Sequence, residues 1–185
     1  MYVLVMIMEW AVVAFIWYGL HRRSVRMTDL ISGGWRRPVH FLRDLGIAVG
    51  FILIFGGGVL QGLGYLLKAA PPQAMRAMMP HSRADLILWV MLSLTAGFCE
   101  EVIHRGYLQR QFAALTNSGA AGIVLQGIVF GLGHGYQGRK LMLIIAIYGI
   151  LFGCLAHWRR SLRPGMIAHC LQDTAGGILA RYLMR

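Results

Sequence analysis

The chain consists of long apolar stretches that alternate with short basic segments, and this alternation limits the folds it can adopt. Residues 45–67 contain no charged residue, and residues 1–20 contain only Glu9. A helix needs about 20 apolar residues to cross the hydrocarbon core of a bilayer. Six segments reach or approach this length, namely residues 1–20, 45–67, 86 to about 112, 119–138, 141–158 and 164–183. We therefore predict an all-α, polytopic transmembrane bundle of about six spans.

Composition favours lipid as the main solvent. The 185 residues are 57% hydrophobic and 14% charged, whereas soluble domains carry about 25% charged residues. The net charge of +11 would suggest a nucleic-acid partner in a soluble protein. Here the basic residues lie between apolar runs, which indicates contact with anionic lipid headgroups and no nucleic acid. We predict a single membrane-embedded domain over residues 1–185.

Arginines mark one side of the predicted membrane protein. The segment between the first two spans holds Arg22, Arg23, Arg26, Arg36, Arg37 and Arg43. The segment after the fifth span, which falls on the same side, holds Arg159, Arg160 and Arg163. Because cytoplasmic loops are enriched in Lys and Arg, we expect this side to be cytoplasmic. A chain this compact is typical of a multi-pass protein of the bacterial inner membrane.

Small residues indicate how the spans pack. Glycines lie four residues apart at Gly46/Gly50, Gly58/Gly62, Gly127/Gly131 and Gly149/Gly153. This spacing lets membrane helices approach closely. The three cysteines, Cys99, Cys154 and Cys170, lie in apolar runs without metal-ligand spacing. We predict that they are small buried packing residues and form neither a disulfide framework nor a structural zinc site.

The first group of ionisable residues inside a predicted span is Glu100, Glu101 and Arg105. Such groups are energetically unfavourable at membrane depth and therefore indicate function. Glu101 and Arg105 are four residues apart, so they can pair on one helix face. Glu100 points about 100° away, with His104 and no arginine on its own face. We therefore assign Glu100 to chemistry and Glu101 to structure.

Two further polar groups lie in later spans. His134 follows Phe130 by four residues near the end of an apolar helix, and His169 precedes Asp173 by four residues. A single intramembrane histidine or ion pair is often purely structural. Because three such groups occur on separate helices of one small protein, we predict that they share a polar cavity inside the membrane.

Together the three groups resemble a known pattern. The sequence reads EEVIHR at 100–105, FGLGH at 130–134 and HCLQD at 169–173. These motifs resemble EExxxR, FxxxH and HxxxN or HxxxD of the CPBP family of intramembrane proteases, which includes the type II CAAX prenyl endopeptidases. The resemblance covers a catalytic core of about residues 86–177. The first two spans match the family only as generic membrane helices.

The resemblance implies a glutamate-type endopeptidase that works inside the bilayer. Carried over by position, Glu100 and His134 would activate a water molecule. His169 and Asp173 would support the oxyanion of the tetrahedral intermediate. The implied substrate is a membrane protein or peptide, cleaved near a membrane-embedded or lipid-modified end. No cofactor is expected.

Other motif residues would support the site. Glu101, Arg105 and Phe130 would hold the catalytic residues or the substrate end in place. Asp173 leaves two roles open, because an ionised aspartate cannot donate a hydrogen bond to an oxyanion as asparagine can. It must be protonated, or it must hold His169 in the correct tautomer.

The depth of the motif residues constrains one helix boundary. If the third span begins near residue 86 and the fourth at residue 119, Glu100 and His134 miss each other by about 12 Å, at about 1.5 Å of rise per residue. They meet if residues 116–122 form a loop. We therefore predict that the fourth helix begins near Ile123.

Three alternative functions remain open from the sequence. Glu100, His134 and His169 could form a His₂Glu zinc set of a metalloprotease, although no HExxH motif is present. The chain could be a non-catalytic immunity or scaffold protein that keeps the polar residues for folding. It could also be a transporter or proton relay, since buried Glu and His residues carry protons.

Overall fold

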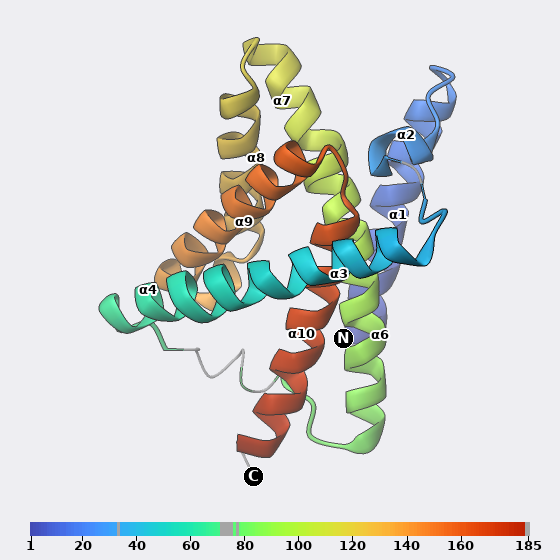
Figure 1. Cartoon of the computed structure of the whole chain (residues 1–185). Coiled ribbons are helices and arrows are strands. Elements are labelled where there is room, and N and C mark those ends of the chain that lie inside the picture. The colour runs from blue at the N-terminus through green and yellow to red at the C-terminus, as the bar shows by residue number, and fades with distance from the viewer. Residues whose placement is uncertain (33, 71–75, 77, 184–185) are drawn as a thin grey trace.

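The described part of the chain consists mainly of helices (Figure 1). The computed structural model describes residues 1–32, 34–70, 76 and 78–183, and this part contains no strand. The α-helices are α1 (Tyr2–His21), α2 (Met27–Ile31), α3 (Pro38–Phe51), α4 (Gln61–Leu66), α6 (Arg83–Glu100), α7 (Gln109–Thr116), α8 (Gly119–Gly133), α9 (Arg139–Arg159) and α10 (Arg163–Leu183). Ile52–Leu60 (η1) and Glu101–Leu108 (η2) are π-helical, and Gly135–Gln137 (η3) is a 3₁₀ turn. The predicted all-α class is confirmed.

Several elements join into helices long enough to cross a bilayer. In the described part, four helices have the necessary length and apolar composition, namely Tyr2–His21, Pro38–Leu66, Arg83–Thr116 and Arg139–Arg159. Helix α8 is shorter, and α10 is a continuous helix of 21 residues that carries Asp173 near its middle. All six predicted spans are therefore helical, in a membrane helical bundle. Many large apolar side chains of α1 and α3 are exposed, as expected for surfaces that face lipid.

The predicted start of the fourth helix is wrong. Helix α8 begins at Gly119 and not near Ile123, because the Ser118 side chain caps it by accepting a hydrogen bond from the Ala121 amide at 3.2 Å. The preceding helix runs to Thr116, beyond the predicted end near residue 112. Glu100 and His134 then lie equally far along the chain from the reversal at Asn117. They can reach the same depth without a long loop.

Glycines bring α8 and α9 into close contact. This contact was predicted from two of the four glycine pairs, Gly127/Gly131 and Gly149/Gly153. A Cβ atom on Gly127 would lie 2.8 Å from the Ile150 backbone nitrogen, and one on Gly131 would lie 2.8 Å from the Ala146 Cα. The pairs Gly46/Gly50 and Gly58/Gly62 have no neighbouring atom within 4 Å. These two pairs therefore do not mark a helix interface within this chain.

The three cysteines are free, but only one is fully buried. Cys99 is buried, Cys170 is partly buried, and Cys154 is exposed. The prediction of a packing role is therefore wrong for Cys154. The apolar run around it has an outward-facing side, since a lipid solvent does not force apolar residues inwards.

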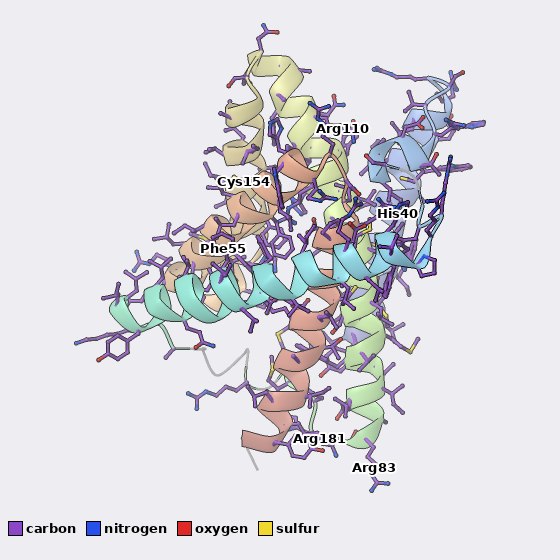
Figure 2. All side chains as sticks on the ribbon, in the orientation of Figure 1. His40, Phe55, Arg83, Arg110, Cys154 and Arg181 are labelled. Atoms are coloured by element: carbon purple, nitrogen blue, oxygen red, sulfur yellow. The ribbon has the colours of Figure 1, made fainter. Side chains whose placement is uncertain are left out.

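Basic residues gather at both ends of the bundle. Arg83 and Arg181 lie at one end, and Arg110 lies at the other (Figure 2). The Arg181 guanidinium donates to the Ser82 carbonyl, which joins the end of α10 to the start of α6. This contact agrees with the side-by-side course of the two helices in Figure 1.

Three arginines of the arginine-rich side surround the buried carboxylate of Asp44 and so have a structural role besides any role in topology. Asp44 of α3 is fully buried, and its Oδ2 accepts a hydrogen bond from Trp35 Nε1 at 3.0 Å. The carboxylate also pairs with Arg163 Nε at 3.3 Å, Arg43 Nη2 at 3.4 Å and Arg159 Nη2 at 3.6 Å. One carboxylate therefore ties α3 to the junction between α9 and α10.

We expect the substitution Asp44→Asn to lower the free energy of unfolding by about 3 kcal/mol, because it leaves partly buried guanidinium groups without their counter-charge. Asparagine keeps an oxygen that can accept the hydrogen bond from Trp35, so the loss of stability measures the contribution of the negative charge. The melting temperature of the purified protein measures the effect. Asp29→Asn is the matched control, since Asp29 pairs with Arg26 on the exposed surface at 3.2 Å. Equal shifts for both variants would contradict the prediction.

Candidate active site

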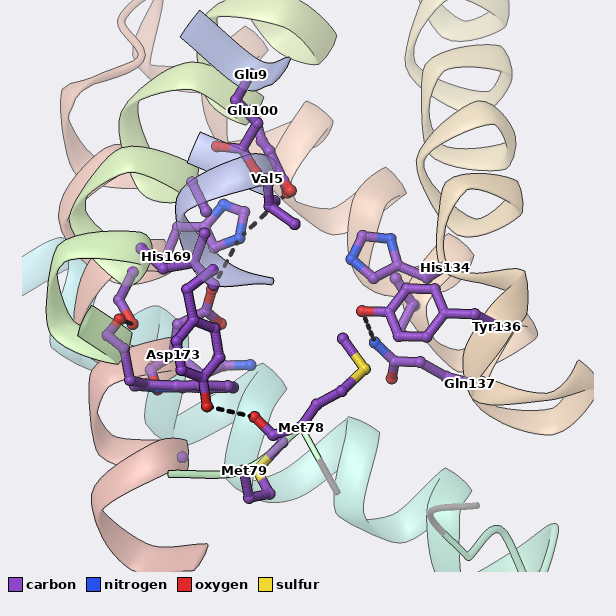
Figure 3. Close-up of a pocket in the computed structure, with 18 of the residues that line it drawn as sticks. Val5, Glu9, Met78, Met79, Glu100, His134, Tyr136, Gln137, His169 and Asp173 are labelled. Atoms are coloured by element: carbon purple, nitrogen blue, oxygen red, sulfur yellow. Dashed lines mark hydrogen bonds and ion pairs between the residues drawn. The ribbon is translucent and has the colours of Figure 1, made fainter. Parts of the chain in front are cut away.

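A cavity of about 520 Å³ opens between α1, α6, α8, α9 and α10 (Figure 3). Much of its wall is apolar or aromatic. Its lining includes the acidic residues Glu9, Glu100 and Asp173, the basic residues Arg76, His134 and His169, and three tyrosines, Tyr2, Tyr136 and Tyr148. The four predicted catalytic residues, Glu100, His134, His169 and Asp173, therefore face one space although three helices supply them. A polar cavity inside an apolar bundle is the arrangement that the motifs predicted.

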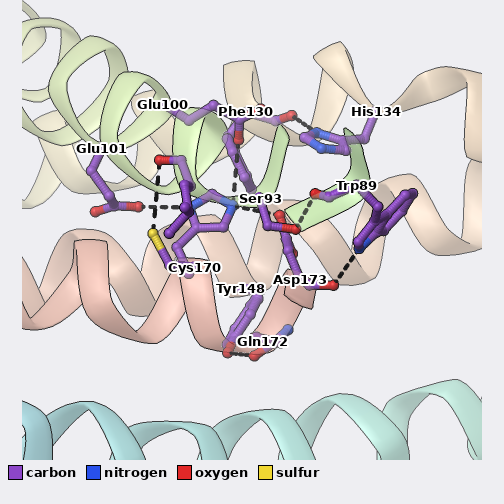
Figure 4. Close-up of polar contacts among 12 residues, drawn as sticks. Trp89, Ser93, Glu100, Glu101, Phe130, His134, Tyr148, Cys170, Gln172 and Asp173 are labelled. Atoms are coloured by element: carbon purple, nitrogen blue, oxygen red, sulfur yellow. Dashed lines mark hydrogen bonds and ion pairs between the residues drawn. The ribbon is translucent and has the colours of Figure 1, made fainter. Parts of the chain in front are cut away.

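His169 contacts three carboxyl groups, those of Glu100, Glu101 and Asp173, which are labelled in Figure 4. Its Nδ1 is 3.2 Å from Oε1 of Glu101, within hydrogen-bond distance. Its Nε2 is 3.6 Å from Oε2 of Glu100 and 3.6 Å from Oδ2 of Asp173. Both latter distances fit ion pairs and are too long for direct hydrogen bonds. Glu101 therefore fixes the orientation of the ring, and the other two carboxyl groups border its cavity side.

Glu101 and Arg105 form the predicted ion pair, and both side chains are buried. Arg105 Nη1 donates to Glu101 Oε1 at 2.8 Å, and Arg105 Nη2 donates to the Gly149 carbonyl at 3.3 Å. The guanidinium carbon lies 4.4 Å from the ring centre of Phe130 and 5.0 Å from that of Phe152. These rings surround the cation with apolar, electron-rich faces. Motif residue Phe130 thus supports Arg105.

The boundary between an α-helix and a π-helical segment falls between the two adjacent glutamates. Glu100 ends α6, and Glu101 begins η2. π-helical turns are rare, wider than α-helical turns, and frequent at functional sites. Glu100 lines the cavity, whereas Glu101 does not and is completely buried against Arg105 and His169. The two carboxylates therefore have different surroundings, as the helix geometry predicted.

Glu100 presents an oxygen to the cavity region without a hydrogen-bond partner. Its Oε2 is buried and unpaired apart from the longer contact with His169. Buried polar atoms without partners are uncommon and call for an explanation such as a bound water or a catalytic role. This oxygen is available to accept a proton.

His134 is positioned by the end of α8. Its Nδ1 is 2.8 Å from the Phe130 carbonyl oxygen. A carbonyl can only accept, so this nitrogen carries the proton and the neutral ring keeps a lone pair on Nε2. The ring borders the cavity (Figure 3). His104, by contrast, does not line the cavity and packs edge-on against Phe130 at 5.0 Å between ring centres.

The structure adds residues to the site that the motifs did not identify. Glu9 of α1 lines the cavity and has a buried Oε2 without a hydrogen-bond partner. Trp89 Nε1 donates to the Asp173 carbonyl at 2.7 Å, and the Tyr148 hydroxyl donates to Gln172 Oε1. The signal for Glu9 was its position as the single charge in residues 1–20. Trp89, Tyr148 and Gln172 carry no comparable signal.

The donors do not form a metal centre as they are arranged. Among the described residues, no three His, Cys, Asp or Glu side chains lie close enough together to hold a metal ion. The predicted zinc alternative would require Glu100, His134 and His169 to converge on one point. The direct contacts of His169 are instead with carboxylates.

Comparison with known proteins gives one match. The family model for type II CAAX prenyl endopeptidase, Rce1-like, matches residues 82–175, half of the chain. No curated protein and no solved structure matches the chain. The matched range contains all three motifs, and the resemblance drawn from them is confirmed.

We expect Glu101→Gln to destabilise the protein by about 3–5 kcal/mol, because it leaves the buried Arg105 charge without its partner. Glu100→Gln should change stability far less, since Glu100 Oε2 has no hydrogen bond to lose. Melting temperatures of the two purified variants test the difference between the adjacent glutamates. A Glu101→Gln protein as stable as the Glu100→Gln protein would contradict this interpretation.

Proposed function

The chain belongs to the Rce1-like family of type II CAAX prenyl endopeptidases, and we propose that it hydrolyses peptide bonds with a water molecule activated by Glu100 and His134. The family consists of proteases, so the chain is a CAAX-type intramembrane protease, and its long apolar helices make it an integral membrane protein. The observation that carries the proposal is the convergence of Glu100, His134, His169 and Asp173 on one cavity.

The first step is the attack of water on the substrate carbonyl. Glu100 and His134 both line the cavity, and Glu100 Oε2 and His134 Nε2 are acceptors. We place the attacking water between these two side chains, where it would donate a hydrogen bond to each. As the water oxygen bonds to the carbonyl carbon, one water proton passes to Glu100. A positioned general base of this kind contributes about 10²–10⁴-fold to a rate.

The second step is stabilisation of the oxyanion. With Glu101 accepting from Nδ1–H, the imidazolium form of His169 carries an Nε2–H that can donate to the oxyanion. Donors held in place before the reaction stabilise developing charge without reorganisation. Glu101 acts through His169, and Arg105 acts through Glu101, so both are positioning residues.

The third step is collapse of the tetrahedral intermediate. Glu100 returns its proton to the amide nitrogen, the carbon–nitrogen bond breaks, and a carboxylic acid and an amine leave. Glu100 therefore serves first as a base and then as an acid. No cofactor takes part in this scheme.

We propose that the substrate is a membrane protein or peptide cut near a membrane-embedded or lipid-modified end. The aromatic and aliphatic wall, which includes Trp89, Phe130 and Phe152, suits an apolar segment beside the scissile bond. We place the protein in a bacterial inner membrane, on the strength of its compact chain and its basic segments.

We expect Glu100→Gln to reduce cleavage at least about a hundredfold, because glutamine cannot accept the proton from water. Glu9→Gln is the matched control, since it makes the same change on the same cavity outside the motifs. Proteomic comparison of peptide termini in cells that carry each variant measures cleavage. If the Glu100→Gln variant still cleaves and the Glu9→Gln variant does not, Glu9 and not Glu100 is the general base.

The two histidines on the flanks of Phe130 provide a second comparison. We expect His134→Ala to abolish cleavage and His104→Ala to leave it largely intact, because only His134 borders the cavity.

Chelator treatment of the purified enzyme should leave activity unchanged. Loss of activity on chelation, with recovery on adding zinc, would replace the proposed mechanism with a metal-dependent one.

We assign Asp173 the role of a protonated hydrogen-bond donor to the oxyanion. The orienting role is already filled by Glu101, which is at hydrogen-bond distance from His169, whereas Asp173 is 3.6 Å from the ring. A donor must keep its proton, so wild-type activity should fall as pH rises and Asp173 ionises. Asp173→Asn should keep activity and lose this alkaline fall. A folded asparagine variant that is inactive at every pH would instead indicate an ionised Asp173.

A further inference from the structure

A second cavity, of about 240 Å³, lies on the arginine-rich side of the bundle. It is enclosed by the end of α2, by η2 and α7, and by the turn between α9 and α10. Its lining residues are Ser32, Arg105, Gln109, Arg110, Ala156, His157, Arg160, Ser161 and Leu162. None of these residues lines the first cavity.

The second cavity is basic, whereas both acidic and basic residues line the first. Arg105, Arg110, Arg160 and His157 line it, and none of its lining residues is acidic. Arg105 is paired with Glu101, but no lining residue supplies a counter-charge for Arg110 and Arg160, so an anion between them would be stabilised. Arginine is the side chain best suited to bind phosphate, because its planar N–H groups match two oxygens at once.

One guanidinium N–H at the cavity has no partner. Arg105 is 2% exposed, and although its Nη atoms bind Glu101 and Gly149, its Nε is buried without a hydrogen bond. An unpaired N–H on a buried cation is unfavourable, and an anionic oxygen in the cavity would remove the deficit.

The walls of the cavity are fixed by hydrogen bonds between distant segments. Arg110 Nη2 donates to the Leu30 carbonyl at 2.9 Å, and Arg110 Nη1 donates to the Asp29 carbonyl at 3.3 Å. The Ser161 hydroxyl and the Leu162 amide both donate to the Ile31 carbonyl at 3.3 Å. The site is therefore formed before a ligand arrives, which lowers the entropic cost of binding.

We propose that the second cavity is a phosphate-binding site, occupied either by the headgroup phosphate of an anionic lipid or by a free phosphate ion. Arg160 caps the C-terminal end of α9, and Arg110 lies towards that end of the bundle in Figure 2, where lipid headgroups meet a membrane protein. The ligand shares Arg105 with Glu101, so its binding stabilises the ion pair behind His169.

The test uses the purified full chain and two probes. Inorganic phosphate is titrated against chloride at equal ionic strength while the melting temperature is measured. Native mass spectrometry of protein from phosphatidylcholine nanodiscs, with and without phosphatidylglycerol, then reports retained lipid. The test variant is His157→Gln with Arg160→Gln, which removes lining charges and leaves the catalytic residues intact. Arg139→Gln with Lys140→Gln, at the opposite end of α9, is the control.

We expect a ligand to raise the melting temperature of the wild type and the control, since binding to the folded state alone is stabilising. The test variant should bind about tenfold more weakly, the usual effect of losing a charged hydrogen bond. If the wild type retains phosphatidylglycerol and the test variant does not, the ligand is a lipid headgroup. If phosphate raises the melting temperature but no lipid is retained, the ligand is a free phosphate ion. The proposal is overturned if neither probe affects the wild type, or if the test and control variants respond alike.

Discussion

The buried pair of Glu101 and Arg105 is the interaction on which the rest of the site depends. Both side chains are buried, and besides pairing with each other each contacts a group from another helix. Arg105 contacts the Gly149 carbonyl of α9, while Glu101 contacts His169 of α10. Desolvating two charges is unfavourable unless the geometry is good and further hydrogen bonds are made. The pair is therefore maintained only when η2, α9 and α10 are correctly packed, which couples the catalytic histidine to the fold.

The adjacent glutamates show how one helix can supply two different carboxylates. Glu101 turns towards a cation and becomes part of the scaffold, whereas Glu100 turns towards the cavity and keeps an unpaired oxygen. Two carboxylates with one shared environment would compete for the same proton. The separation at the start of η2 avoids this and leaves one acid free for proton transfer.

The sequence predicted the helices and the residues of the site better than their connections. Long apolar runs identify spans because lipid imposes a length, and ionisable residues within them stand out for the same reason. The start of α8 at Gly119 depends on the local Ser118 cap, whereas the place of Glu9 depends on contacts between distant segments. A local pattern does not contain those contacts. The second cavity depends on the Ile31 and Leu30 carbonyls, which carry no side-chain signal at all.

The contacts of Arg105 explain why the planar geometry of an arginine, and not merely a positive charge, suits this position. One guanidinium donates to Glu101 through Nη1 and to Gly149 through Nη2, and it has a third direction, through Nε, beside the second cavity. A lysine ammonium is a single point on a flexible stem and cannot span these three directions in one plane. Arg105 thus reaches the catalytic residues through Glu101 and His169, and it also lines the second cavity together with Arg110 and Arg160. A lysine at this position would keep the positive charge but would lose at least one of these contacts, and with it the link between the second cavity and the orientation of His169.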